Sequence, residues 1–219
     1  MDFAGLVRSI DWNFLEGTVA RVLAVLLCLT VHETCHGMAA YALGDPTARD
    51  RHRLSLNPLR HIDWLGLAMM LAVGFGWAKP VPVDPRYFKK PKQGMALTAL
   101  AGPVSNLLLA LLAVFLSREL YARGAWMPMG IRVSLFQFLL YTLAPLSIGL
   151  GLFNLLPIPP LDGSKVLGAF LPDRAYFGWM RYERYGMFLL LALSWFGVTG
   201  DLISGAILGG YRFLFELFF

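Results

Sequence analysis

Charged residues are scarce in this sequence. Asp, Glu, Lys and Arg together make up 15% of its 219 residues, whereas a soluble domain usually contains about 25%. Hydrophobic residues make up 57%, and the mean hydropathy is +0.59. This composition excludes an ordinary soluble domain and predicts a single integral membrane domain over residues 1–219. The chain has a net charge of +5. In a membrane protein, basic residues usually lie in cytoplasmic loops, so this charge does not make nucleic acid an expected partner.

Cysteines are also scarce, since the chain has only Cys28 and Cys35. If both lie on one helix, seven residues place their Cα atoms about 10 Å apart along its axis. A disulfide needs less than about 7 Å, so these two cysteines cannot pair there. We expect both to be packing residues, and they do not indicate a redox compartment.

The sequence has no internal repeats or low-complexity tracts, and we expect no cleaved leader. Its first sixteen residues mix acidic and basic side chains: Asp2, Arg8, Asp11 and Glu16. A cleaved signal peptide would begin with a basic segment, so we expect the first apolar helix to stay in the mature protein. We also expect no PDZ-like or nucleotide-sensing domain.

Four apolar stretches are long enough to span a bilayer, which takes about 20 helical residues. The expected transmembrane helices cover 18–43, 94–116, 133–156 and 186–208. The last contains Gly200 and Asp201, where it can break. Residues 65–75 are apolar but too short to span, so a re-entrant or interfacial segment is expected there. Prolines in 76–85 favour an extended, strand-like continuation. The predicted fold class is an all-α polytopic membrane protein.

Lys and Arg are distributed unevenly among the predicted loops. The loop between the first two helices holds nine and the loop between the last two holds four, thirteen in all, against six elsewhere. Basic residues gather in cytoplasmic loops. These two loops are therefore expected in the cytoplasm, and both termini on the other side.

The first predicted helix contains "HETCH", residues 32–36, a costly sequence to place in a membrane. His32 and His36 are one turn apart, about 40° around the axis and about 6 Å along it, so both rings can reach one metal ion. Glu33, one step round, can hold a water molecule beside that ion. This spacing is typical of two zinc ligands and a general base. The alternative is a chance match to this short pattern.

A catalytic zinc usually has three protein ligands, so a third is expected. His52 and His61 lie in a charged loop and are interpreted as solvated histidines. Asp162 follows three prolines at the end of the third helix and precedes Gly163. Alone, this Asp-Gly pair indicates only a turn. Because the first and third helices both descend to the predicted cytoplasmic side, Asp162 is the better candidate.

These residues resemble the site-2 protease family of intramembrane zinc metalloproteases, specifically a compact prokaryotic branch. The resemblance rests on "HETCHG" and "NLLPIPPLDG", with support from "LGDPTA", "RLSLNPLRHID", "FGWAKPVPVDP" and "AGPVSNLLLA". It implies a three-helix catalytic core, one zinc ion held by His32, His36 and Asp162, and Glu33 as catalytic acid and base. It implies peptide-bond hydrolysis in or near a transmembrane helix of another membrane protein. The implied location is a prokaryotic inner (plasma) membrane, with the site toward the cytoplasm.

Two asparagines are candidates for substrate binding or an oxyanion contact. Asn106 follows the Gly102-Pro103 kink on the second helix, and the resemblance places it near the active centre. Its alternative role is an interhelical hydrogen bond. Asn154 opens the second motif.

The extended segment over residues 79–83 is expected to pair with substrate by β-augmentation.

Two other functions remain open at the level of sequence. A membrane zinc transporter or metal sensor would also place histidine and aspartate within the bilayer, although a transport path needs ligands spread across it. A catalytically silent scaffold would have no need of Glu33. The motifs therefore favour a protease.

Overall fold

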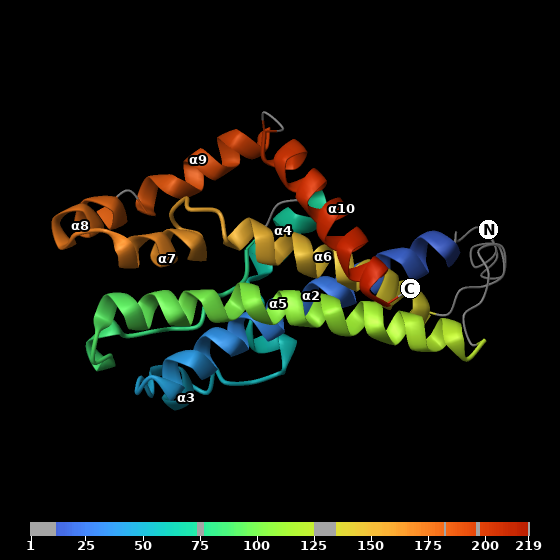
Figure 1. The fold of residues 1–219 in the computed structure, drawn as a ribbon, viewed down its shortest axis with the longest axis horizontal. Coiled ribbons are helices and arrows are strands. Elements are labelled where there is room, and N and C mark those ends of the chain that lie inside the picture. Colours follow the sequence, from blue (N-terminus) through green and yellow to red (C-terminus); the bar gives the residue numbers. More distant parts are fainter. Residues whose placement is uncertain (1–11, 74–76, 125–134, 182, 196–197, 219) are drawn as a thin grey trace, which may run out of the picture.

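The computed structural model describes residues 12–73, 77–124, 135–181, 183–195 and 198–218. Three long helices run side by side: α2 (Trp12–Ala42), α5 (Pro91–Ala122) and α6 (Leu135–Asn154) (Figure 1). The shorter elements are α3 (Thr47–Asp50), η1 (Pro58–Arg60), α4 (Trp64–Val73), η2 (Pro85–Tyr87), α7 (Asp162–Phe170), α8 (Asp173–Arg181), α9 (Glu183–Trp195) and α10 (Val198–Phe218). None of the described residues lies in a β-strand, which confirms the predicted all-α class for this part of the chain.

Three of the four predicted spans are confirmed as helices long and apolar enough to cross a membrane. They cover Gly17–Ala42, Pro91–Ala122 and Phe136–Asn154. Small side chains line the contacts between these helices, including Ala24, Cys28, Ala110, Ala113 and Ala144, all buried. Small residues let helix backbones approach closely where lipid supplies no hydrophobic drive for association. Cys28 is thus a packing residue, as expected, whereas Cys35 is half-buried.

The fourth predicted helix, over 186–208, is wrong as a single element. Its residues are divided between α9, which ends at Trp195, and α10, which begins at Val198. The two helices run in different directions (Figure 1), and the division comes before Gly200 and Asp201. Packing explains the direction of α10, which lies against α6. A Cβ added at Gly149 of α6 would lie 2.8 Å from Ile207 Cδ1 of α10.

The segment between α2 and α5 contains a short helix where a re-entrant or interfacial piece was expected, and a re-entrant course for it stays a prediction. The extended or strand-like part is irregular and forms no strand among the described residues. Residues 64–73 form α4, and residues 77–84 have no regular secondary structure. Residues 77–84 form no β-ladder with other described residues, because backbone N–H groups in this segment donate to a loop carbonyl and to a side chain. Lys79 N donates to His61 O at 2.9 Å, and Val81 N donates to Glu33 Oε2 at 2.8 Å.

The connections place α3, α7 and α8 at one end of the bundle, opposite the end where α5 stops (Figure 1). Lys92 at the start of α5 fastens this end. Its Nζ donates to Leu171 O at 2.5 Å and pairs with Asp173 Oδ1 at 2.8 Å, where α7 passes into α8. The α7 helix is thereby held against α5, and its first residue, Asp162, lies beside α2.

Candidate metal centre

Two histidines of α2 provide the first part of the site. His32 and His36 are buried, and their Nε2 atoms lie 3.0 Å apart. The i, i+4 spacing puts both rings on the helix face that meets α5. That face is open to them because residue 102 of α5 is glycine. A Cβ there would lie 2.5 Å from His36 Nε2 and 2.7 Å from His32 Cε1.

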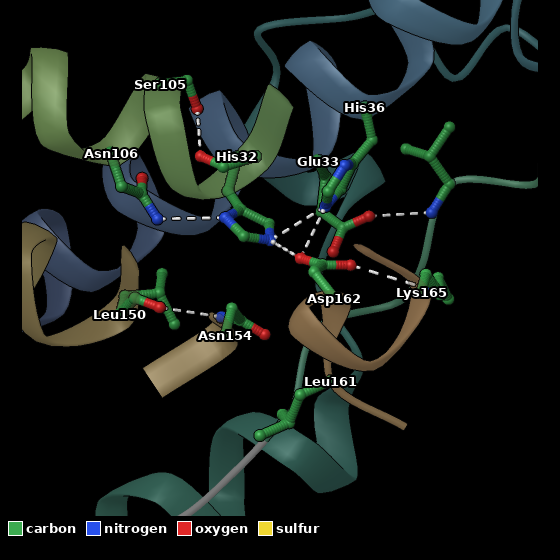
Figure 2. A network of polar contacts seen from close by, with 12 residues as sticks. His32, Glu33, His36, Ser105, Asn106, Leu150, Asn154, Leu161, Asp162 and Lys165 are labelled. Atoms are coloured by element: carbon green, nitrogen blue, oxygen red, sulfur yellow. Dashed lines mark hydrogen bonds and ion pairs between the residues drawn. The ribbon is translucent and has the colours of Figure 1, made fainter. Parts of the chain in front are cut away.

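Asp162 completes the cluster from the first turn of α7. Its Oδ2 lies 3.2 Å from His32 Nε2 and 3.1 Å from His36 Nε2, and Figure 2 shows the three groups pointing toward one another. A tight turn brings Asp162 there. Gly163 comes so close to the preceding chain that an added Cβ would lie 2.1 Å from Leu155 O. The sequence pairs Asp with Gly here because no larger residue fits the turn.

These three donors fit a zinc ion. Ligand atoms about 2.0–2.1 Å from a tetrahedral metal are about 3.3–3.4 Å from each other, and the three observed separations are 3.0, 3.1 and 3.2 Å. The Asp162 Oδ2 atom is buried and has no hydrogen-bond partner of regular geometry. Burial opposes ionisation of Asp162, but the two imidazole rings outweigh it and hold the pKa of this carboxyl below its usual range.

The far side of each ring is held by α5. His36 Nδ1 lies 2.7 Å from Thr98 O. A carbonyl can only accept, so Nδ1 carries a proton, and Nε2 is the ring atom that can bind a metal. His32 Nδ1 lies 3.0 Å from Asn106 Nδ2. Such contacts orient metal-binding histidines and fix their tautomers.

Glu33 lies beside the cluster and contacts the irregular segment between α4 and α5. Its Oε2 accepts the Val81 N–H at 2.8 Å (Figure 2). The end of that segment is fixed by Asp45, which is fully buried and whose Oδ2 accepts the Asp84 N–H at 2.7 Å. The carboxylate of Glu33 is therefore positioned by a backbone that is itself anchored to the loop after α2.

The other candidates take separate places. Asn154 donates from Nδ2 to Leu150 O at 2.9 Å, one turn back on α6, and does not touch the three donors (Figure 2). His52 is exposed, with φ of 53°. His61 is buried, so its interpretation as a solvated histidine is wrong. Its ring has a partner inside the loop, because its Nε2 lies 2.7 Å from Ser55 O. Neither histidine belongs to the cluster.

Three residues at or beside the site escaped sequence reasoning. Asp45, Thr98 and Gly102 act on the site through packing or backbone contacts. Two of them had a partial signal in the sequence. Gly102 precedes Pro103, which indicated a kink but not room for two rings, and Asp45 lies in the quoted stretch LGDPTA, which assigned it no role.

Comparisons with known proteins agree with this geometry. The profile described as Peptidase family M50 matches residues 127–195. The chain is 41% identical over 172 residues to "Putative zinc metalloprotease YwhC" of Bacillus subtilis, covering 78% of each chain. It is 28% identical to "Putative zinc metalloprotease Rip2" of Mycolicibacterium smegmatis, covering 77% of this chain and 63% of the relative. The protein of the same name from Mycobacterium tuberculosis is 29% identical, with 88% and 71% covered. No solved structure matches.

Proposed function

The chain belongs to peptidase family M50 and is a zinc metalloprotease of the membrane, and we propose that it hydrolyses peptide bonds in or near transmembrane segments of other membrane proteins. One observation carries this proposal: His32 and His36, two of the three side chains that could hold a metal ion, lie within the candidate span Gly17–Ala42. A peptide bond cut at this site must therefore enter the helix bundle at the depth of the membrane. Proteins that span the same membrane have peptide bonds at that depth.

The roles of the side chains follow from their positions. We assign His32, His36 and Asp162 to the zinc ion, which when bound polarises a carbonyl and lowers the pKa of water. Glu33 is not among the three donors, so its carboxylate is left to take a proton from the attacking water and deliver it to the leaving amine. Within the described residues, His32, His36 and Asp162 form the only group of three or more such side chains that could hold a metal ion. This supports a catalytic centre over a chain of sites for metal transport.

The segment over residues 77–84 is the proposed contact for the substrate backbone. It runs beside Glu33, is anchored at Asp84 by Asp45 and makes no ladder with other described residues. A substrate unwound from its helix can pair with residues 79–83 by β-augmentation. Because Val81 also bonds to Glu33, this pairing would set the distance between the scissile bond and the base.

We propose that the loops carrying α3 and α7–α8 face the cytoplasm of a prokaryotic cell, in its inner (plasma) membrane, because thirteen of the nineteen Lys and Arg residues lie there. A cysteine placed at position 90 is expected to resist an impermeant thiol reagent on intact cells. A cysteine at position 3 should react. Labelling at 90 but not at 3 would reverse the topology.

Asn106 has two candidate roles, and its contact with His32 favours a positioning role over an oxyanion contact. A ring nitrogen that binds a metal carries no proton, so His32 must carry its proton on Nδ1 and needs an acceptor there. The Asn106 amide lies 3.0 Å away, and its Oδ1 is buried without a partner. Turning the amide over presents Oδ1 to this N–H, and amide orientation is set by such networks.

We expect Asn106→Leu to weaken zinc binding about 10- to 100-fold and Asn106→Asp to retain it, because a carboxylate oxygen also accepts from His32. Competition with a zinc chelator measures both affinities, and activity per zinc-loaded molecule is measured alongside. If both variants bind zinc normally but lose turnover, Asn106 contacts the oxyanion instead. Wild-type zinc affinity with specific activity within about threefold, and a lower melting temperature, would make it a packing residue.

The proposed function itself is tested by comparing membrane proteomes of cells that produce the wild-type protein or the Glu33→Gln variant. Fragments with new termini in or near a transmembrane segment should be present with the wild type and absent with the variant. If the only fragments that differ come from soluble proteins, or if none differ, cleavage of membrane substrates is wrong.

A further inference from the structure

A concave site lies in the segment between α2 and α5 and shares no lining residue with the metal centre. It is a pocket of about 430 Å³. Four cationic side chains line it: Arg51, Arg53, Arg60 and Lys79. No carboxylate lines it, so its electrostatic potential is positive. A pocket of this kind attracts an anion.

Two of these cations are held by hydrogen bonds to the backbone, and none of the four is neutralised by an ion pair among the described residues. Arg60 donates to His52 O at 2.6 Å, and Arg53 Nη2 donates to Lys79 O at 2.7 Å. Both partners are backbone carbonyls. None of the ion pairs found among the described residues includes any of the four cations.

The acidic side chains that neighbour the lining residues in the sequence have other partners. Asp50 pairs with Arg49, and Asp63 accepts the Gly66 N–H at 2.9 Å. The Nε of Arg53 is buried without a hydrogen-bond partner. The Arg53 side chain as a whole still lines the pocket, and arginine guanidinium groups are suited to phosphate oxygens.

The rim of the pocket is apolar and exposed. Leu59 and Trp64 line it with 67% and 71% of their surfaces accessible. Trp64 also begins α4, a helix of ten residues that contains no charged side chain. Exposed tryptophan between a basic cluster and an apolar segment is typical of the membrane–water interface. The occupant of this pocket therefore needs an anionic head and an apolar body.

We propose that this pocket binds the phosphate headgroup of an anionic phospholipid such as phosphatidylglycerol, with the acyl chains passing over Trp64 and Leu59. The arginines and Lys79 contact the phosphate, and the apolar rim distinguishes the lipid from free phosphate. Basic pockets on membrane proteins recognise anionic headgroups in this manner. The site depends on the membrane location of the chain but not on the assignment of its catalytic residues.

The test is a calorimetric titration of the purified full-length protein in detergent with short-chain phosphatidylglycerol. Short-chain phosphatidylcholine and inorganic phosphate are titrated in parallel. The informative variant is Arg51→Gln/Lys79→Gln, because neither side chain makes a described hydrogen bond or ion pair. Its matched control is Arg118→Gln/Arg123→Gln, which removes two exposed cations at the opposite end of α5.

We expect phosphatidylglycerol to bind the wild type and the control equally, and the informative variant about 25-fold more weakly, at about fivefold per cation. Phosphatidylcholine should bind much more weakly to all three. Equal affinity in the informative variant overturns the proposal, as does equal affinity for phosphatidylcholine. Inorganic phosphate binding as tightly as the lipid would make this a free-anion site and overturn the lipid assignment.

Zinc content and melting temperature establish that each variant is folded. Should the double variant fail to fold, Arg51→Gln and Lys79→Gln are each expected to weaken binding about fivefold, and wild-type affinity in both would contradict the site. Proteolytic activity plays no part in this readout. Failure of the lipid site and failure of the proposed protease function are thus separate results.

Discussion

Glu33→Gln is expected to abolish peptide-bond hydrolysis while leaving about one zinc ion bound per chain. The zinc should stay because the converging donors are His32, His36 and Asp162, and Glu33 is not one of them. The fold should stay because a glutamine oxygen can still accept the Val81 N–H that Glu33 accepts at 2.8 Å. Glutamine cannot take a proton at neutral pH, however, so the chemical step loses its base.

The size of this effect separates a catalytic role from a structural one. Removing a general acid–base usually costs about 10²- to 10⁴-fold in turnover. The measurement is cleavage of a membrane-protein substrate by purified enzyme, with zinc determined by elemental analysis on the same preparation. The matched control is Glu119→Gln, an acidic residue of α5 that pairs with Arg118 and Arg123 far along the helix. It should cleave at the wild-type rate.

Turnover within tenfold of the wild type in Glu33→Gln would contradict the assigned role, once contaminating protease is excluded. A preparation of His32→Ala/His36→Ala, made in the same way, provides that exclusion. If Glu33→Gln instead loses zinc together with activity, Glu33 supports the metal rather than the proton transfer.

The sequence was most informative about site residues that are close together in the chain. One helical turn relates His32 to His36, so the sequence alone placed both rings on one side of α2. Asp162 is 126 residues from His36 in the chain. Its choice required an argument about helix direction, together with a family resemblance. The structure brings the three together within 3.0–3.2 Å.

The sequence was less informative where tertiary packing decides the outcome. The apolar stretch 186–208 has the length of one span, but it is divided because α10 packs against α6. His61 looks like a loop residue in sequence, yet a backbone carbonyl at Ser55 gives it a partner in the interior. Gly102 makes room for two rings that approach from another helix. None of these tertiary contacts is accompanied by a periodic pattern or a fixed residue spacing from which it could be predicted.

Removal of the histidine pair is expected to eliminate zinc binding. In His32→Ala/His36→Ala, Asp162 remains as the sole member of the donor cluster. A lone carboxylate does not supply the three protein ligands of a catalytic zinc site. We therefore expect zinc to fall from about one ion per chain to near zero, with cleavage lost. Elemental analysis after gel filtration measures the stoichiometry.

The control for this prediction is His52→Ala, which removes an exposed histidine outside the cluster and should leave zinc and cleavage unchanged. Asp162→Ala tests the third ligand separately. It removes the Oδ2 atom that lies 3.1 and 3.2 Å from the two rings, and zinc affinity should fall by at least about 100-fold because two histidines do not complete the site. Equal zinc in the wild type and the His32→Ala/His36→Ala variant would show that the metal is bound elsewhere in the chain. Normal zinc in Asp162→Ala alone would keep the histidine pair but require a different third ligand.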